Sequence, residues 1–343
     1  MELHDIKEHL QNHFSDGLVV IVGSGLSCGE GIPGMGDLAK HLIDEVPKSI
    51  QGDDEEPWSE VASLLENGED LESVLLKVKL SESLEVSVLD ATHAFILFHE
   101  AKVIKEVVSE GRTLKFSRLL DHLLKPNSGL PVITTNYDRL IEIATEAKGF
   151  AVNNLSTGKY FGSFEPRESR FSMCRNIRRK GKLAHLEYTD FVTVLKPHGS
   201  VDWFLVNDEP MFSSIIHDAR KLMITPGVNK FRGGYDRPFD THREIANKEI
   251  DKASRYLIIG YGFNDEHLQV HLEQQLNNGK PAVILTHSIS DNTREYIANR
   301  ENIWTIVSRK DDPGFKLIIG KKEFEFNDLN IWDLGIFVEE VLE

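Results

Sequence analysis

The sequence has few cysteines, no long apolar run and no excess of positive charge, and each shortage excludes a class of protein. The two cysteines, Cys28 and Cys174, are too few for a disulfide framework or for a zinc site made of four cysteines. No run reaches the roughly 18 apolar residues of a membrane span. The formal net charge of -16 argues against direct nucleic-acid binding, because phosphate contacts need lysine and arginine.

The N-terminus and the cysteine content both bear on location. The first 14 residues are polar and amphipathic and have none of the features of a signal peptide. Sparse cysteine suits a reducing compartment. We therefore expect a cytoplasmic protein.

What the chain of 343 residues does contain is a regular alternation of apolar runs and amphipathic segments. Residues 18–22 form a continuous β-branched run, typical of a strand buried on both faces of a parallel sheet. Similar runs recur at 131–135, 192–195, 222–225, 256–259, 282–286 and 303–307. Segments with helical spacing occur at 3–14, 37–46, 241–253 and 266–277. The pattern predicts an α/β fold with a Rossmann-like, doubly wound parallel sheet.

Two long segments interrupt this alternation within a single predicted domain of residues 1–343. Residues 50–125 have helical periodicity without strand alternation, so we expect a helical insertion after the first strand–helix unit. Residues 150–192 have little periodicity, and we expect a loop-rich lid or excursion there. This segment holds a basic cluster of Arg167, Arg170, Arg175, Arg178, Arg179, Lys180 and Lys182. The cluster is either a solvated loop or a contact for an acidic partner or a phosphate.

Glycine-rich turns follow two of the predicted strands. Gly23-Ser24-Gly25-Leu26-Ser27 comes after the first strand and is followed by Gly31-Ile32-Pro33, and Gly260-Tyr261-Gly262-Phe263-Asn264-Asp265 follows 256–259. Glycines at such a turn let the backbone approach a phosphate, and the N–H groups of the next helix face it. The spacing is not G-x-G-x-x-G, and either turn is also compatible with a strand-to-helix connection that binds no ligand.

Two further motifs carry polar side chains at strand ends. In Thr134-Thr135-Asn136-Tyr137-Asp138, the amide and the carboxylate can meet one ligand, or they can cap the next helix. In Lys196-Pro197-His198-Gly199-Ser200, His198 is the side chain that titrates nearest neutral pH. Because open α/β sheets bind ligands at the carboxyl ends of their strands, we expect these motifs to meet at one cleft.

The four motifs occur in an order that resembles the sirtuin superfamily, and more closely its bacterial branch of NAD-cleaving anti-phage defence proteins. The motifs are GSGLS with GIP, TTNYD, KPHGS and GYGFND, and they span about residues 15–290. The resemblance implies a sirtuin-like NAD-binding domain that cleaves the bond between nicotinamide and ribose.

The resemblance also assigns roles to individual residues. It places the first motif at the pyrophosphate and the nicotinamide pocket of NAD, through Gly23, Ser24, Gly25, Ser27, Ile32 and Pro33. It places Asn136 beside the nicotinamide ribose, Asp138 at the carboxamide, and His198 on the ribose hydroxyls as a base. The last motif would contact the adenosine side through Gly260, Tyr261 and Gly262.

Two departures from deacylase sirtuins bear on the activity. The chain lacks the two C-x-x-C pairs of their zinc module, so we expect no zinc, and Gly34-Met35-Gly36-Asp37 stands where deacylases have D-F-R-S. We therefore expect NAD hydrolysis to nicotinamide and ADP-ribose, with Asn136 and His198 as the catalytic residues. NAD-dependent protein deacylation and a non-catalytic sensor of NAD or ADP-ribose are the alternatives.

An NAD hydrolase has to be held inactive until it is needed, and the resemblance to defence proteins implies control by assembly. We expect a homo-oligomer, with the helical insertion as a candidate assembly surface. Control by a separate partner, such as a hexameric DNA-translocating ATPase or an Argonaute-type protein, is the alternative that the resemblance implies. We expect neither membrane attachment nor direct nucleic-acid binding.

Overall fold

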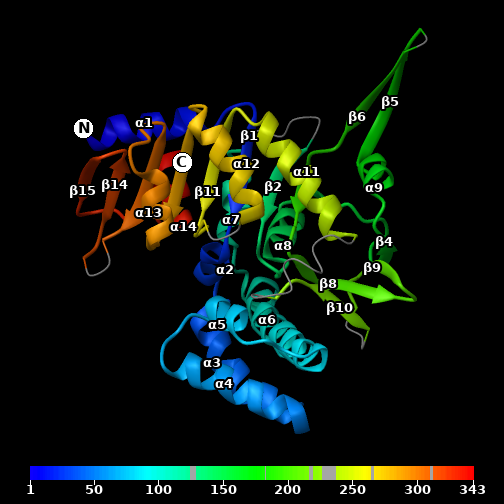
Figure 1. The fold of residues 1–343 in the computed structure, drawn as a ribbon. Helices are drawn as coiled ribbons and strands as arrows, with labels where there is room; N and C mark the ends of the chain where they lie inside the picture. The colour runs from blue at the N-terminus through cyan, green and yellow to red at the C-terminus, as the bar shows by residue number, and fades with distance from the viewer. Residues whose placement is uncertain (124–128, 182, 216–218, 226–236, 264–265, 310–311) are drawn as a thin grey trace.

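A nine-stranded sheet forms the centre of the protein in a computed structural model (Figure 1). The structure describes residues 1–123, 129–181, 183–215, 219–225, 237–263, 266–309 and 312–343. The strand order is β15-β14-β13-β12-β11-β1-β2-β7-β3. The strands are β1 (Leu18–Val22), β2 (Leu130–Thr134), β3 (Ala151–Asn153), β7 (Phe191–Leu195), β11 (Arg255–Ile259), β12 (Ala282–Thr286), β13 (Ile303–Ser308), β14 (Phe315–Ile319) and β15 (Lys322–Phe326). Those from β3 to β13 run parallel, and β14 and β15 add an antiparallel hairpin at one edge.

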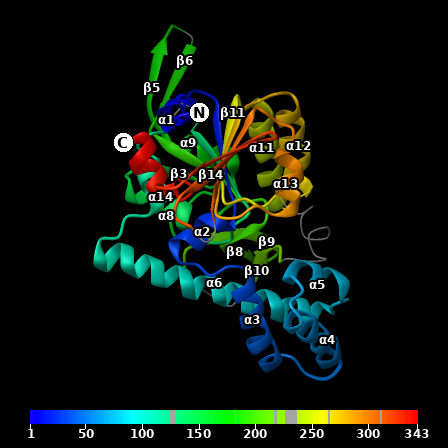
Figure 2. The same cartoon turned by 90° about the vertical axis from the view of Figure 1, so that its left-hand side faces the viewer.

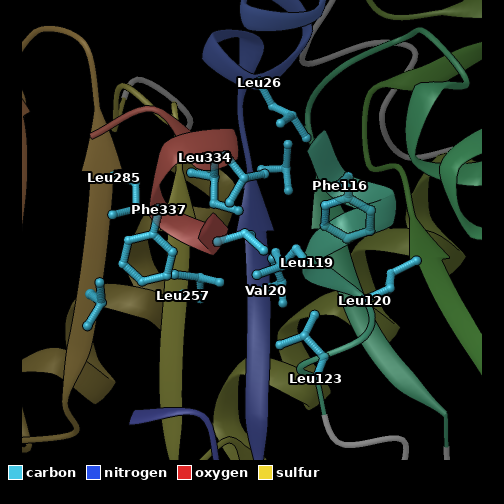
Figure 3. Packing of buried hydrophobic residues seen from close by; sticks show 14 of the residues in the cluster. Val20, Leu26, Phe116, Leu119, Leu120, Leu123, Leu257, Leu285, Leu334 and Phe337 are labelled. Atoms are coloured by element: carbon cyan, nitrogen blue, oxygen red, sulfur yellow. The ribbon is translucent and has the colours of Figure 1, made fainter. Parts of the chain in front are cut away.

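Helices cover both faces of this sheet, which confirms the doubly wound α/β fold predicted from the sequence. One face packs against α1 (Leu3–His13), α2 (Ser24–Glu30), α7 (Lys115–Leu119), α8 (Leu140–Ala147) and α14 (Leu334–Phe337). The other face packs against α11 (Phe239–Lys252), α12 (Glu266–Asn277) and α13 (Asp291–Ile297). Figure 3 shows Leu257 of β11 beside Phe337 of α14, with Val20 of β1 in the same cluster.

The apolar run at 18–22 has the burial that its composition predicts. All five residues of β1 are buried, with Val20 and Val22 in the cluster on one face and Val19 and Ile21 in the cluster on the other. A strand buried on both faces needs apolar side chains at every position, which explains why the sequence shows no alternation there.

The helical insertion has a core of its own. Its helices α4 (Glu55–Glu66), α5 (Leu71–Lys77) and α6 (Glu82–Glu110) pack with α3 (Met35–Glu45) around a separate cluster that includes Trp58 and Val74. In Figures 1 and 2 these helices lie below the sheet. Helix α7 differs, because Phe116 and Leu119 pack in the core of the sheet. Within the described part of the chain, no helix combines the length and apolar content needed to cross a bilayer.

A small antiparallel sheet was not predicted. Its order is β10-β8-β9-β4, made of β4 (Phe161–Ser163), β8 (Gly199–Val206), β9 (Glu209–Ser213) and β10 (Arg220–Met223). The run at 222–225 was expected among the parallel strands, and this was wrong, because β10 pairs antiparallel with β8. An apolar run indicates a strand but does not specify its neighbour.

The segment at 150–192 also differs from the expected loop. It contains β3, β4, the short helix α9 (Pro166–Ser172) and a two-stranded hairpin of β5 (Cys174–Lys180) and β6 (Leu183–Tyr188). We call this hairpin the arm, and Figure 1 shows it projecting away from the sheet. Because most described residues of the arm are exposed, and the rest are only half-buried, its side chains are not selected for apolar alternation and its sequence does not indicate strands. Lys182 lies outside the described residues.

Candidate functional site

A cavity of about 240 Å³ lies at the carboxyl ends of the central strands. Of the predicted site residues, only Gly25 and Gly260 do not line it. The predicted residues that line it are Gly23, Ser24, Ser27, Ile32, Pro33, Asn136, Asp138, His198, Tyr261 and Gly262. Residues far apart in the sequence therefore meet there because the ends of β1, β2, β7 and β11 are neighbours in the sheet. Asn264 and Asp265 of the last motif lie outside the described residues.

The cavity sits where the strand order changes direction. Chain order runs from β1 outward to β2 and β7 on one side and to β11, β12 and β13 on the other. At such a switch point the loops after two adjacent strands diverge and leave a crevice, which is where open α/β sheets bind ligands.

Gly25 and Gly260 do not line the cavity, and they have a different reason to be glycine. Gly25 N donates to Gly260 O over 3.0 Å, so the turns after β1 and β11 touch. A Cβ on Gly25 would lie 2.6 Å from the Cα of Gly260, and Gly260 itself has a φ of +56°. Neither position accepts a side chain without moving the backbone of the other.

Helix α2 was not predicted, because the helix after the first glycine-rich turn was expected at 37–46, where the structure has α3. Gly23 is its N-cap and Ser24 its first residue, so most of the expected turn is already helical. The first turn of α2 carries Ser27 into the cavity, where its Oγ donates to Asp138 Oδ2 over 2.6 Å. A hydroxyl that both donates and accepts can link two neighbouring polar groups.

The amide of Asn136 is held in one orientation. Its Nδ2 donates to Gly23 O over 2.9 Å and to Ser27 Oγ over 2.7 Å. Gly23 O can only accept, so the nitrogen and not the oxygen of the amide must face it. Both amide hydrogens are thereby engaged, and the carbonyl oxygen Oδ1 is the part of the side chain that a ligand can use.

Asp138 both caps the next helix and lines the cavity, which are the two interpretations that its motif allowed. Its Oδ1 accepts from Leu140 N at the start of α8 over 3.1 Å, while Oδ2 accepts from Ser27 at the cavity. The side chain is buried, and burial raises the pKa of this carboxyl above its usual value. The positive charge of Lys196 and the Ser27 hydrogen bond both oppose that rise.

Hydrogen bonds from the insertion hold the loop that carries Asn136 and Asp138. Glu100 of α6, only 1% exposed, accepts from Arg139 Nε over 3.0 Å, from Nη2 over 2.5 Å and from the backbone N of Arg139 over 2.5 Å. The insertion also supplies Glu72, Phe95 and Ile96 to the cavity wall, and α3 supplies Leu38. Sequence reasoning missed these residues, because helical periodicity indicates burial without indicating what is buried against it.

His198 lies on the opposite loop of the same cavity. It is half-buried, and its carbonyl accepts from Ile224 N over 2.9 Å. The next residue, Gly199, has a φ of +89°, and a Cβ there would lie 2.3 Å from Leu222 O. A glycine is therefore required directly after His198, and the small sheet fixes the position of this loop.

The geometry defines an open α/β protein with a cleft at the carboxyl edge of its sheet, lined in part by the polar side chains of Asn136, Asp138 and His198. The family model of the SIR2-like domain matches residues 131–306, and the chain belongs to this family. The matched residues include the motifs of Asn136, His198 and Gly260. The first glycine-rich motif and the helical insertion lie outside the match.

Several solved structures are similar to this chain. A Sir2 homolog in complex with NAD is 15% identical, with 83% of this chain and 84% of that chain covered and a TM-score of 0.42. A mutant Sir2 homologue in complex with ADP-ribose is 15% identical, with 84% and 87% covered and a TM-score of 0.41. A structure described as the structural basis of sirtuin substrate affinity is 15% identical, with 85% and 90% covered and a TM-score of 0.40. No curated protein matches the chain.

Proposed function

We propose that this protein binds NAD in the cavity and hydrolyses the bond between nicotinamide and ribose. The observation that carries the proposal is that Asn136 and His198, from the ends of two different strands, line one cavity. The amide of Asn136 is already oriented by Gly23 and Ser27. Preorganised polar groups of this kind stabilise charge that develops in a transition state.

The chemistry that we propose needs little from the protein beyond positioning. The C–N bond breaks with its electron pair going to the nicotinamide nitrogen, which becomes neutral, so no general acid is required. Positive charge develops on the ribose carbon, where the carbonyl oxygen of Asn136 can stabilise it or hold a water molecule. The water oxygen bonds to that carbon and loses a proton, which His198 can accept or relay.

The departure of the motifs from those of deacylases supports water as the acceptor, because Gly34-Met35-Gly36-Asp37 stands where deacylases have D-F-R-S. Apolar side chains form part of the cavity wall: Leu38 of α3, and Phe95 and Ile96 of the insertion. An aromatic ring such as nicotinamide suits this lining.

We also propose that the activity is a regulated, NAD-depleting response in anti-phage defence, carried out by a cytoplasmic homo-oligomer with a partner protein. Resemblance of the motifs supports the defence role. The distribution of charge supports self-association: the arm exposes Arg175 and Arg179, whereas the insertion exposes Glu55, Glu56 and Glu60. The arm and the insertion lie at opposite ends of the molecule (Figures 1 and 2), so the two surfaces can meet only between copies.

Mass analysis of nucleotides tests the proposed reaction. Purified protein is incubated with NAD, with and without an acetyl-lysine peptide, beside the variants Asn136→Ala and His198→Ala. We expect nicotinamide and ADP-ribose without peptide, and strongly reduced amounts from both variants. Nicotinamide release only with peptide would indicate deacylation. NAD binding without turnover under any condition would indicate a sensor.

A further inference from the structure

A buried lysine lies directly behind the two loops of the site. Lys196 is the first residue after β7, two positions before His198, and is only 2% exposed. Lysine is almost never fully buried unless its ammonium is paired and hydrogen-bonded. The partners of this ammonium therefore show what it does.

The three donors of the ammonium reach three different elements. Lys196 Nζ donates to the backbone oxygen of Asp138, to Ser200 Oγ over 3.1 Å, and to Glu142 Oε1 of α8 over 2.9 Å. An ammonium has three N–H groups, so its donor capacity is filled. One of the three bonds goes to the loop that carries Asp138, and another goes to Ser200 of β8, directly after the loop that carries His198.

Additional bonds join these loops at the same place. Ser200 Oγ donates to Tyr137 O over 3.2 Å, and Val201 N donates to the same oxygen over 3.0 Å. Tyr137 lies between Asn136 and Asp138 in the chain. The ammonium therefore adds hydrogen bonds to a contact that sets the separation of the two loops.

The charges around Lys196 keep it protonated. Burial alone would lower its pKa, but the carboxylates of Glu142, Asp202 and Asp138 outweigh burial and raise it. Glu142 Oε2 has no partner within the described residues, and burial raises the pKa of Glu142 to about 6. The cluster therefore contains more carboxylate than one ammonium satisfies, which is more than a simple core ion pair requires.

We propose that Lys196 is a positioning residue that fixes the Asn136–Asp138 loop against the His198 loop. Its ammonium acts through the Asp138 carbonyl and Ser200, and its positive charge favours the ionised form of the Asp138 carboxyl that holds Ser27. The kinetic form of this inference rests on the proposed function.

Removing only Lys196 would leave the buried Glu142 without the ammonium that it pairs with and could unfold the protein. The test therefore replaces the pair by apolar residues, Lys196→Met with Glu142→Leu, which buried ion pairs often tolerate. Glu142→Gln is the matched control, because it removes the charge of the ion pair but keeps an acceptor for the ammonium. Ser200→Ala removes the hydrogen bonds of its hydroxyl to Lys196 and to Tyr137 O and leaves every charge in place.

The readout is kcat and KM for NAD on protein shown by circular dichroism to be folded. We expect the double variant to lose about 100-fold in kcat with a much smaller change in KM, because misplacement of reacting groups by about 1 Å has that effect. Ser200→Ala should lose about tenfold, and Glu142→Gln should stay within about threefold of the wild type. A double variant with wild-type kcat, or a Glu142→Gln variant as impaired as Ser200→Ala, would overturn the inference.

Hydrogen exchange separates failure of this inference from failure of the proposed function. If the wild type does not cleave NAD, the proposed function fails, but the loops can still be measured. We then expect backbone amides of 134–140 and 196–201 to exchange about tenfold faster in Ser200→Ala, and in the double variant if it folds, than in Glu142→Gln. Equal exchange rates in these variants would show that Lys196 does not position the loops.

Discussion

The hydroxyl of Ser27 is the link between the Asp138 carboxyl and the Asn136 amide, so Ser27→Ala perturbs the centre of the site with the loss of one atom. Ser27 is 4% exposed, donates to Asp138 Oδ2 and accepts from Asn136 Nδ2. A hydrogen bond to a charged group contributes about 1.5–3 kcal/mol, and leaving a buried donor unpaired costs about 1–3 kcal/mol. Because Asn136 keeps its bond to Gly23 O, we expect a total loss of about 3 kcal/mol in the free energy of unfolding.

Urea denaturation at neutral pH measures this change, and Ser24→Ala is the matched control. Ser24 lies in the same helix and lines the same cavity, but it is exposed, so its replacement should alter stability by at most about 0.5 kcal/mol. NAD cleavage by Ser27→Ala should also fall by about tenfold or more, because the Asn136 amide is no longer held on both sides. Equal stability of the two variants would refute the chain of hydrogen bonds from Asp138 to Asn136.

Three further predictions concern other parts of the molecule. Burial lowers the pKa of His13 to about 4. Below pH 6.5 the unfolded chain therefore takes up a proton at His13 that the folded protein does not. This difference should lower the free energy of unfolding by about 2 kcal/mol between pH 6.5 and 5. Urea denaturation of His13→Gln, which keeps a donor for Tyr256 O, should show a pH dependence smaller by that amount; an unchanged dependence would contradict the assignment. Gly260→Ala should destabilise by about 2 kcal/mol more than Gly279→Ala, since both glycines have positive φ but only Gly260 meets backbone within 3 Å; equal thermal shifts would show that the turns are not in contact. Replacing Arg175 and Arg179 with glutamate should weaken self-association in sedimentation experiments at low salt, and an unaffected oligomer would exclude the arm as its interface.

Much of the main sheet can be predicted from the sequence, because strands buried on both faces appear in it as continuous apolar runs. Val19 to Val22 have no polar position to obscure the pattern, and the same holds for 256–259. The small antiparallel sheet left a weaker record, since β10 is a four-residue strand with two basic residues, Arg220 and Lys221. Its pairing with β8 is a tertiary fact that neither segment encodes alone.

The site divides in the same way. Polar motifs at strand ends predicted that Asn136, Asp138 and His198 would line one cavity, because parallel strands bring their carboxyl ends together. Lys196 stood in one of these motifs, but its burial depends on acceptors contributed by Asp138, Glu142 and Ser200. The ion pair between Glu100 and Arg139 likewise joins the insertion to a loop at the edge of the sheet. Contacts of this kind arise only once the chain is folded.

A single-turnover measurement of nicotinamide release shows whether the cavity that holds Asn136 cleaves NAD. Wild-type protein and Asn136→Ala are mixed in excess with NAD, and ADP-ribose binding to each is measured by calorimetry to show that the cavity is intact. We predict that Asn136→Ala binds ADP-ribose but releases nicotinamide about 100-fold or more slowly, as expected for loss of a preorganised group that stabilises the transition state. Release at the wild-type rate by Asn136→Ala with normal binding would contradict the claim that this cavity cleaves NAD.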